Sequence, residues 1–374
     1  MSKYKTWVEI KEKSVAHNIQ SFKRLLAPKV KLWSVVKSNA YGHGLVPFSQ
    51  LAALYGAQGF CVDSVPEGLK LRENGIKKPI LVLGPTLFPE LHKNAAAHDI
   101  SVTVSNFDAL HAVAKLPRPP SFHLKIDSGM HRQGFYANEI PQVIKIIKNK
   151  KLEFKNALEG VYTHFASAKD INYPTYTDLQ FANFKKVLGT LECAGFKNLV
   201  SHAAATGGTL VNSKYHLDAV RIGIGLYGLW PSKELFLQTK GITLKPVLSW
   251  HARISEIKML KKGDFVGYDL AERVNGPTKI AVLPIGYWHG FPRALSGIGT
   301  ILINGKAAKV MGRVSMDLVV VNANGISCKV GNRATIIGIQ NGLNLSAFDT
   351  AQKMGTIHYE LITRINPLIE RVIV

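Results

Sequence analysis

Short apolar runs alternate with longer amphipathic stretches between about residues 31 and 225. This pattern is typical of a parallel sheet, because a crossover helix separates each buried strand from the next. Eight such runs occur, at residues 32–36, 59–62, 80–84, 100–105, 122–127, 158–164, 199–203 and 219–223. The stretches at 139–148 and 176–194 repeat their apolar residues at steps of three and four, as amphipathic helices do. Eight alternations of strand and helix over about 200 residues predict a (β/α)8 TIM-type barrel, which we assign to residues 11–235.

The pattern changes after about residue 241. Short runs with alternating apolar positions follow, separated by glycines, at residues 248–257, 279–285, 300–303, 318–321 and 335–339. Such runs are typical of β-sheets, so we expect a mainly-β C-terminal domain over residues 236–374. We also expect a strand at residues 4–10 to join this second domain. The predicted fold class is therefore α/β, with a barrel followed by a mainly-β domain.

Composition and charge exclude several classes of protein. The chain has 374 residues, 46% of them hydrophobic, which is enough for two domains with buried cores. Its 47 Lys and Arg residues against 25 Asp and Glu residues give a formal net charge of +22. The cations are scattered along the chain and no nucleic-acid-binding motif is recognisable, so we predict no nucleic-acid partner.

The N-terminal segment and the cysteines bear on the cellular compartment. Residues 1–7 lack the apolar run of a signal peptide or a membrane anchor. The three cysteines Cys61, Cys193 and Cys328 are odd in number and lie far apart, with no disulfide framework and no metal-ligand spacing. We therefore expect a cytoplasmic protein that contacts no membrane and binds no metal.

A lysine follows the first apolar run. Reactive groups of a TIM-type barrel lie at the carboxyl ends of the strands, so Lys37 should lie in the barrel mouth. A partly desolvated amine there can form a Schiff base with an aldehyde. A lysine that only extends its charge into solvent at a strand end explains the position equally well. Three further polar groups lie at or near other strand ends and should reach the same mouth: Arg132, His164 and Arg221.

The loops after the seventh and eighth runs suit an anion. Barrels commonly bind phosphate with the loops that follow these two strands. Here the first loop carries Thr206, Gly207 and Gly208 and the second carries residues 223–225, which offer a hydroxyl and accessible backbone N–H groups. Ordinary turn glycines are the alternative interpretation. A phosphate site beside an amine that captures aldehydes, however, is what pyridoxal phosphate requires.

At these positions the sequence resembles the alanine racemase family, and the resemblance extends from about Trp7 to the C-terminus. The most specific motif, VVKSNAYGHG at residues 35–44, is similar to the family's pyridoxal-phosphate attachment site. Further similar segments are KIDSGMHRQG (125–134), THFASA (163–168), VRIGIGLYG (220–228), GDFVGYD (263–269) and GRVSMD (312–317). The resemblance therefore covers both predicted domains.

The resemblance implies that pyridoxal 5'-phosphate is the cofactor and that Lys37 binds it covalently. The other residues implied to contact the cofactor are Tyr41, His164, Thr206, Arg221, Gly223, Ile224 and Tyr359. Those implied to contact the substrate or to line its entrance are Arg132, Met316 and Tyr287. Lys125 stands where many family members carry a carbamylated lysine that braces the substrate-binding arginine. The family forms a head-to-tail homodimer, in which Tyr268 and Met316 would act in the partner's active site.

The implied activity is the interconversion of L-alanine and D-alanine, which supplies D-alanine for peptidoglycan. Two acid/base groups are needed, because one proton leaves one face of the α-carbon and another arrives on the opposite face. The resemblance assigns Lys37 to the D-enantiomer and Tyr268 to the L-enantiomer. It also places Arg221 at the pyridine nitrogen, which stays unprotonated because a guanidinium does not readily release its proton. This weakens the cofactor as an electron sink and disfavours transamination.

Departures from the family pattern leave alternatives for the substrate. Trp288 and His289 replace a small and an acidic residue, so a racemase of serine or lysine remains an alternative. Thr206 stands where the family usually has serine and keeps the hydroxyl. A non-catalytic pyridoxal-phosphate carrier is a second alternative, although such carriers resemble the barrel alone and lack the region after about residue 241.

Overall fold

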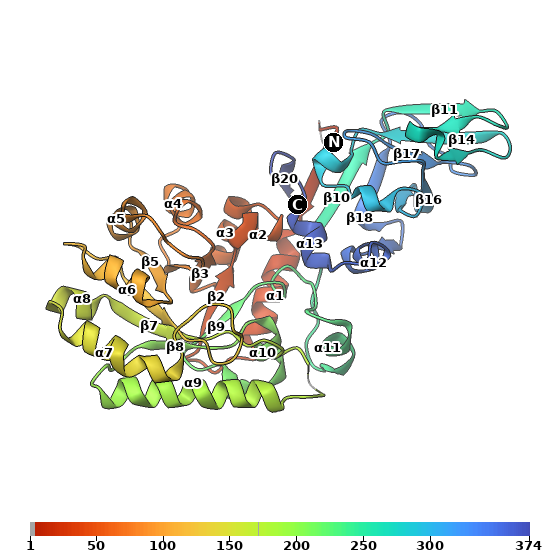
Figure 1. Cartoon of the computed structure of the whole chain (residues 1–374). Coiled ribbons are helices and arrows are strands. Elements are labelled where there is room, and N and C mark those ends of the chain that lie inside the picture. Colours follow the sequence, from red (N-terminus) through yellow and green to blue (C-terminus); the bar gives the residue numbers. More distant parts are fainter. Residues whose placement is uncertain (1–3, 171) are drawn as a thin grey trace. The chain divides into compact units, whose positions relative to one another are not determined.

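The computed structural model describes residues 4–170 and 172–374 (Figure 1). The chain divides into two compact units. We call the first the barrel unit, which comprises Lys13–Ala40 and Phe48–Lys245. The second, called the β unit, comprises Met1–Glu12, Tyr41–Pro47 and Pro246–Val374.

Eight parallel strands form the centre of the barrel unit, and this prediction is confirmed. They are β2 (Lys31–Val35), β3 (Gly59–Val62), β4 (Ile80–Val82), β5 (Ile100–Val104), β6 (Phe122–Lys125), β7 (Leu158–Tyr162), β8 (Val200–His202) and β9 (Ala219–Ile222). Their order in the sheet is β8-β7-β6-β5-β4-β3-β2-β9. An isolated parallel bridge between Ala205 and Arg221 joins its two ends, so the sheet closes into a near-barrel. The strands are buried nearly throughout, which explains why they read as continuous apolar runs.

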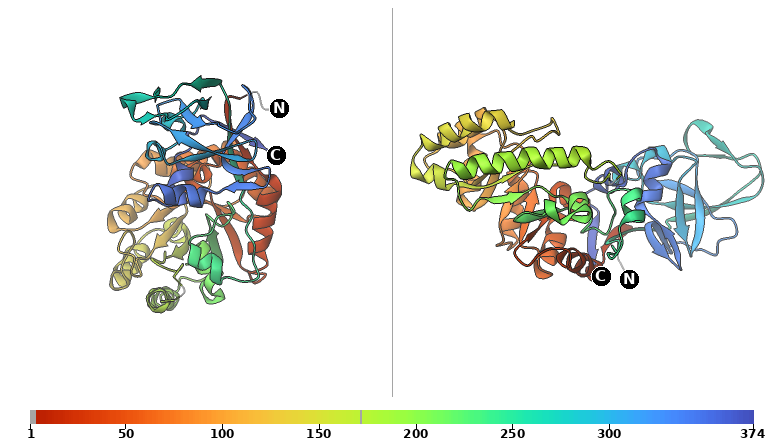
Figure 2. Two further views of the ribbon diagram at one scale, coloured as in Figure 1. Left: turned by 90° about the vertical axis from the view of Figure 1, so that its right-hand side faces the viewer. Right: turned by 90° about the horizontal axis from the view of Figure 1, so that it is seen from below.

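Helices surround these strands (Figure 1). They are α1 (Glu12–Lys23), α3 (Leu45–Leu54), α4 (Val65–Glu73), α5 (Pro89–Ala97), α6 (Phe107–Ala114), α7 (Ile140–Lys148), α8 (Leu152–Asn156), α9 (Thr175–Cys193) and α10 (Thr206–Val211). A further short helix, α11 (Lys233–Gln238), follows the last strand. The helices predicted at 139–148 and 176–194 are confirmed as α7 and α9, and Figure 2 shows α9 lying along the outside of the barrel. No helix within the described residues combines the length and the apolar character that a membrane crossing requires.

The β unit contains a mixed ten-stranded sheet. Its strands are β1 (Thr6–Ile10), β10 (Leu248–Arg253), β11 (Glu256–Leu260), β14 (Thr278–Leu283), β15 (Thr300–Ile303), β16 (Lys306–Met311), β17 (Val319–Asn322), β18 (Arg333–Gln340), β19 (Leu343–Leu345) and β20 (Glu370–Ile373). Strand β1 lies between β10, with which it pairs antiparallel, and β20, with which it pairs parallel. A separate ribbon joins β12 (Phe265–Val266) to β13 (Glu272–Arg273). The helices of this unit are α12 (Ala347–Lys353) and α13 (His358–Thr363).

One predicted strand is wrong in its extent. Residues 248–257 were expected to form a single strand, but β10 ends at Arg253 and β11 begins at Glu256. The chain changes partners between them, because the amide of Ile254 donates to the carbonyl of Asn332 and that of Ser255 donates to Val282. An apolar pattern does not record which neighbour a strand pairs with, so this break is invisible in the sequence.

Candidate active site

Lys37 follows β2 and opens a left-handed turn, α2 (Lys37–Tyr41). The φ angles of Ser38, Asn39 and Ala40 are 56°, 56° and 52°. The amide of Ala40 donates to the carbonyl of Val36 at 2.8 Å and closes the turn. Left-handed helical backbone costs an L-residue about 1–2 kcal/mol, so such a turn persists only where its surroundings stabilise it.

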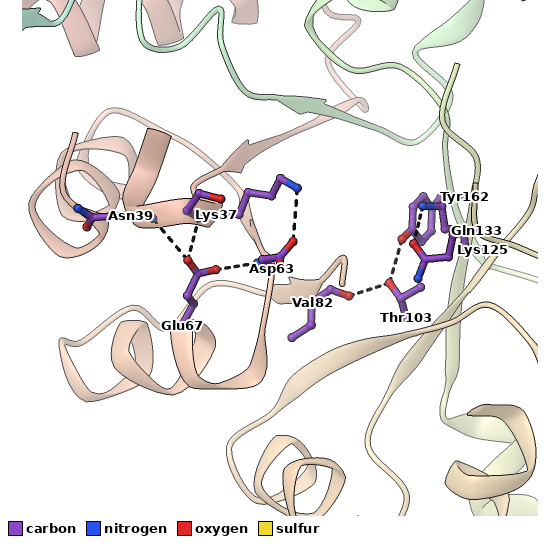
Figure 3. Close-up of polar contacts among 10 residues, drawn as sticks. Lys37, Asn39, Asp63, Glu67, Val82, Thr103, Lys125, Gln133 and Tyr162 are labelled. Carbon is purple, nitrogen blue, oxygen red and sulfur yellow. Dashed lines mark hydrogen bonds and ion pairs between the residues drawn. The ribbon is translucent and has the colours of Figure 1, made fainter. Parts of the chain in front are cut away.

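Two carboxylates lie beside this turn, Asp63 directly after β3 and Glu67 in α4 (Figure 3). The Lys37 amine forms an ion pair with Oδ1 of Asp63 at 3.4 Å, and 37% of the lysine side chain is exposed. The Glu67 carboxylate accepts hydrogen bonds from the amides of Ser38 and Asp63 at 2.8 and 2.7 Å. The amine is therefore held at the mouth of the barrel while remaining accessible to a ligand.

Arg221 occupies the barrel interior, with only 2% of the residue exposed. One terminal nitrogen donates to Nδ1 of His202 at 2.6 Å. The other donates to the carbonyls of Thr163 at 2.7 Å and Ala203 at 3.1 Å. It also lies 3.3 Å from Nδ1 of His164. These contacts fix the orientation of the guanidinium plane.

The barrel mouth is strongly cationic. Burial, followed by the charges of Arg221, Arg132, Lys125 and Lys37, lowers the pKa of His164 to about 3. Burial, followed by the charges of Arg132 and Arg221, lowers the pKa of Lys125 to about 8. Histidine 164 is therefore neutral at physiological pH, and the cluster suits a ligand that carries anionic groups.

The loop that carries Arg132 is organised by one buried carboxylate. Oδ1 of Asp127 accepts from the amides of residues 129–131 at 2.9–3.0 Å, and Oδ2 accepts from the Arg132 amide at 2.9 Å. Burial raises the pKa of Asp127, but these backbone N–H groups outweigh it and lower the pKa below its usual value. Beside this loop, Nζ of Lys125 donates to Oε1 of Gln133 at 2.9 Å.

Thr206 connects the two loops predicted to hold an anion. Its hydroxyl oxygen accepts from the amides of Gly223 and Gly225 at 3.2 and 3.3 Å. The Gly223 amide is therefore directed at this hydroxyl, while the hydroxyl keeps its own hydrogen to donate. Ile224, between the two glycines, is buried. A Cβ at Gly225 would lie 2.5 Å from the ring of Phe22, so only glycine fits this close approach.

In the β unit, Tyr287 and Met316 lie on neighbouring loops. The Tyr287 amide donates to the carbonyl of Ser315 at 3.1 Å, and the Trp288 amide donates to that of Met316 at 3.0 Å. Both side chains are largely exposed, at 45% for Tyr287 and 56% for Met316. The two residues thus share one surface of this unit.

Tyr268 lies on a third loop of the same unit and is 68% exposed. An ion pair of 2.6 Å between Asp269 and Arg313 ties its loop to the one that carries Met316. Elsewhere in the β unit the rings of Tyr41 and Tyr359 lie 6.2 Å apart. Burial, and then the neighbouring Tyr41, raise the pKa of Tyr359, so its hydroxyl stays protonated.

The predicted residues are thus divided between the two units. The barrel unit holds Lys37, Lys125, Arg132, His164, Thr206, Arg221, Gly223 and Ile224. The β unit holds Tyr41, Tyr268, Tyr287, Met316 and Tyr359.

Several side chains that support the barrel group were not singled out from the sequence. His202 closes β8 and satisfies the same strand-end criterion that identified His164. Asp127 ends the apolar run at 122–127 and satisfies this criterion too, whereas Glu67 gave no such signal, because it lies on a helix.

Comparisons with known proteins agree with the resemblance noted above. Residues 10–231 match the family model for the N-terminal domain of alanine racemase, and residues 247–373 match that for its C-terminal domain. Alanine racemase from Leptospira interrogans is 35% identical over 378 residues, which cover 99% of this chain and 96% of that protein. Alanine racemase from Listeria innocua is 36% identical over 367 residues, covering 98% and 97% of the two chains.

Solved structures show the same similarity. The alanine racemase from Bacillus anthracis with bound L-Ala-P superposes with a TM-score of 0.93 at 35% identity, covering 100% of this chain and 96% of that one. The enzyme from D-cycloserine-producing Streptomyces lavendulae gives a TM-score of 0.89 at 30% identity, with coverages of 100% and 98%.

Proposed function

The chain belongs to the alanine racemase family of isomerases, and from this premise we propose how its own residues interconvert L-alanine and D-alanine. The observation that carries the proposal is the cationic mouth of the barrel, where Lys37 follows β2, Arg221 lies on β9 and Thr206 follows β8. The match of residues 247–373 to the second family domain argues against a carrier built on the barrel alone.

The barrel group fits pyridoxal 5'-phosphate as the cofactor. An accessible amine on a strained turn suits an aldehyde, and the excess of cations suits a phosphate. Lys37 would bind the cofactor covalently, Arg221 and His164 would hold its ring, and Thr206, Gly223 and Ile224 would hold its phosphate. When bound, the cofactor acidifies the substrate's α-hydrogen by withdrawing electrons from the α-carbon.

Two residues move the proton. Lys37 would exchange it on one face of the α-carbon, and Tyr268 on the other, so that either enantiomer can lose a proton to one group and gain one from the other. Arg132 would hold the substrate carboxylate, because its loop is fixed by Asp127 and a guanidinium can form a bidentate pair with a carboxylate. Lys125 would brace Arg132 when carbamylated, because the carbamate is anionic whereas the free amine and the guanidinium repel each other.

We propose that Tyr268, Tyr287 and Met316 complete the site of a second subunit in a homodimer. All three side chains are highly exposed in the single chain, which is unusual for catalytic and substrate-binding groups. A site shared by two chains would explain this exposure. The product would supply D-alanine for peptidoglycan, and we propose a cytoplasmic location for the reaction.

The first test is the conversion of L-alanine to D-alanine by the purified protein with pyridoxal phosphate. We expect turnover that is lost in Lys37→Ala and falls by at least about 100-fold in Tyr268→Phe, the range that general acid–base catalysis contributes. Normal turnover by either variant would contradict its proposed role.

Substrate breadth is tested in the same assay. Trp288 is 57% exposed and directly follows Tyr287, so a bulky side chain stands beside the proposed entrance. We expect alanine to be preferred over L-serine and L-lysine. Faster turnover of L-serine or L-lysine would leave the proposed mechanism unchanged but would contradict alanine as the preferred substrate.

A further inference from the structure

We propose that Glu67 is a positioning residue for Lys37. One carboxylate holds both the backbone turn that presents the lysine and the segment that carries its ionic partner, Asp63. This inference rests on the proposed function, in which Lys37 binds the cofactor, and it adds a residue that never touches the cofactor itself.

The geometry involves both carboxylate oxygens (Figure 3). Oε1 of Glu67 accepts from the amides of Ser38 at 2.8 Å and Asn39 at 3.4 Å. Oε2 accepts from the amide of Asp63 at 2.7 Å. Asp63 in turn pairs with the Lys37 amine at 3.4 Å. Glu67 is therefore linked to the lysine along two routes, one through its backbone and one through its ion-pair partner.

The turn needs such an acceptor. The first amides of a helical turn have no carbonyl partner within the turn itself. In a left-handed turn built from serine, asparagine and alanine there is also no glycine to relieve the backbone strain. Without Glu67, Ser38 and Asn39 would relax toward the extended conformation, and the direction of the adjacent Lys37 side chain would change with them.

A purely local role for Glu67 makes a different prediction. The residue lies in the first turn of α4, where an acidic side chain also stabilises the helix N-terminus. If that were its whole contribution, its removal would loosen α4 and leave the Lys37 turn unaffected. The turn itself must therefore be measured.

The experiment compares Glu67→Ala and Glu67→Gln with Glu73→Ala, an exposed glutamate of the same helix, in the full-length protein. Binding of pyridoxal phosphate to cofactor-depleted protein gives its Kd. Borohydride reduction followed by peptide mapping gives the rate of attachment at Lys37. Hydrogen exchange reports on the peptide that contains Ser38 and Asn39.

We expect Glu67→Ala to weaken cofactor binding by about tenfold or more, to slow attachment and to accelerate exchange in the Lys37 turn. Glu67→Gln should lie between this variant and the wild type, because its amide oxygen still accepts from Ser38 whereas its NH2 group cannot accept from Asp63. Glu73→Ala should match the wild type in all three measurements.

Unchanged Kd, attachment and exchange in Glu67→Ala would overturn the inference, as would faster exchange confined to α4. If Glu67→Ala does not fold, the test rests on Glu67→Gln. A wild-type Kd, attachment rate and hydrogen exchange in Glu67→Gln would then reject the positioning role. Lys37→Ala is treated in parallel to separate this inference from the proposed function. If the cofactor attaches to another residue in Lys37→Ala, both the proposed function and this inference are rejected. If attachment requires Lys37 but is the same in the Glu67 variants as in the wild type, only this inference is rejected.

Discussion

The Arg221 guanidinium donates a 2.6 Å hydrogen bond to Nδ1 of His202 inside the barrel. Because a guanidinium only donates, Nδ1 of His202 carries no hydrogen. Burial, and then the charge of Arg221, lower the pKa of His202 well below its usual value, so the ring is neutral with its proton on Nε2. That proton points to Nδ1 of His123 at 2.9 Å. Both tautomers thus follow from the fixed charge of Arg221.

The first prediction concerns that charge. Arg221→Glu should raise the ratio of transamination to racemisation by roughly tenfold or more, which corresponds to about 1.4 kcal/mol in relative barriers. A carboxylate at this position would favour a protonated ring nitrogen and a stronger electron sink. Pyruvate formed per racemisation event measures the ratio. Arg221→Lys keeps a cation and should keep the ratio low; an unchanged ratio in Arg221→Glu would contradict the proposed role.

The second prediction concerns His123, which accepts from His202 and is itself buried. His123→Leu removes the acceptor and leaves a buried N–H group unsatisfied, which costs about 1–3 kcal/mol. Because Arg221 still donates to Nδ1 of His202, the proton stays on Nε2 and has lost its acceptor, so the ring is held less firmly against Arg221. We expect lower stability and a loss of kcat in His123→Leu, and a partial recovery in His123→Asn, whose side-chain oxygen can accept.

Nitrogen NMR of the His202 ring distinguishes this explanation from simple loss of packing. In the wild type, Nε2 should be protonated and Nδ1 should not, and in His123→Leu the proton should stay on Nε2 while the Nε2 resonance shifts because its acceptor is lost. A His202 ring with its proton on Nδ1 in the wild type would show that the hydrogen-bond chain runs differently.

The third prediction uses the pKa of Lys125, which burial and the charges of Arg132 and Arg221 lower to about 8. Only a neutral amine reacts with carbon dioxide, so a carbamate should form on Lys125 increasingly as the pH rises through about 8. The stability of the folded protein should change with pH in the same direction, increasing as the pH rises above about 8. A lysine whose pKa is lowered on folding destabilises the fold below that pKa, and the penalty fades as the pH rises toward the value of the unfolded chain.

Carbon NMR with labelled bicarbonate at pH 6.5 and 8.5 tests this prediction. We expect a carbamate signal that grows with pH and is lost in Lys125→Ala. The Gln133 side chain, which accepts from the Lys125 amine at 2.9 Å, competes for the same group. Gln133→Leu should therefore increase carbamate formation. If neither the wild type nor Gln133→Leu shows a carbamate signal at pH 8.5, Lys125 acts as a free amine.

Much of the fold was predictable because burial on both faces makes each barrel strand a continuous apolar run. The counted runs became strands β2 to β9, and the run that ends before Lys37 correctly placed that residue at a strand end. The long strand expected at 248–257 failed, since the partner exchange at Ile254 depends on residues about 30 and 80 positions away.

The supporting side chains were less accessible to sequence reasoning. Residues that sit at strand ends, such as Arg221 and His164, could be identified by position. The contact between His123 and His202 spans 79 residues and depends on strand register, which single-sequence patterns do not contain. The left-handed turn after Lys37 lacks the glycine that normally announces such a backbone. Glu67 was missed for the same reason, because its role exists only once that turn is known.

The last prediction tests whether the active site is shared between subunits. If Tyr268 acts in the partner's site, each Lys37→Ala chain lacks the lysine of its own site but supplies an intact tyrosine to the other. A mixed dimer of Lys37→Ala and Tyr268→Phe chains then contains one intact site and one doubly defective site. Since half of the dimers in an equal, freely exchanged mixture are mixed, activity should return to about one quarter of the wild-type value.

The matched control mixes Lys37→Ala with the double variant Lys37→Ala/Tyr268→Phe, in which no arrangement restores a complete site. Both mixtures are measured after subunit exchange, with the mixed dimer verified by native mass spectrometry. Recovery in the first mixture alone would assign the exposed Tyr268 side chain to the neighbouring subunit. A verified mixed dimer without activity would instead place lysine and tyrosine in the same chain's site, and the 68% exposure of Tyr268 would then require that its loop closes over that site when substrate binds.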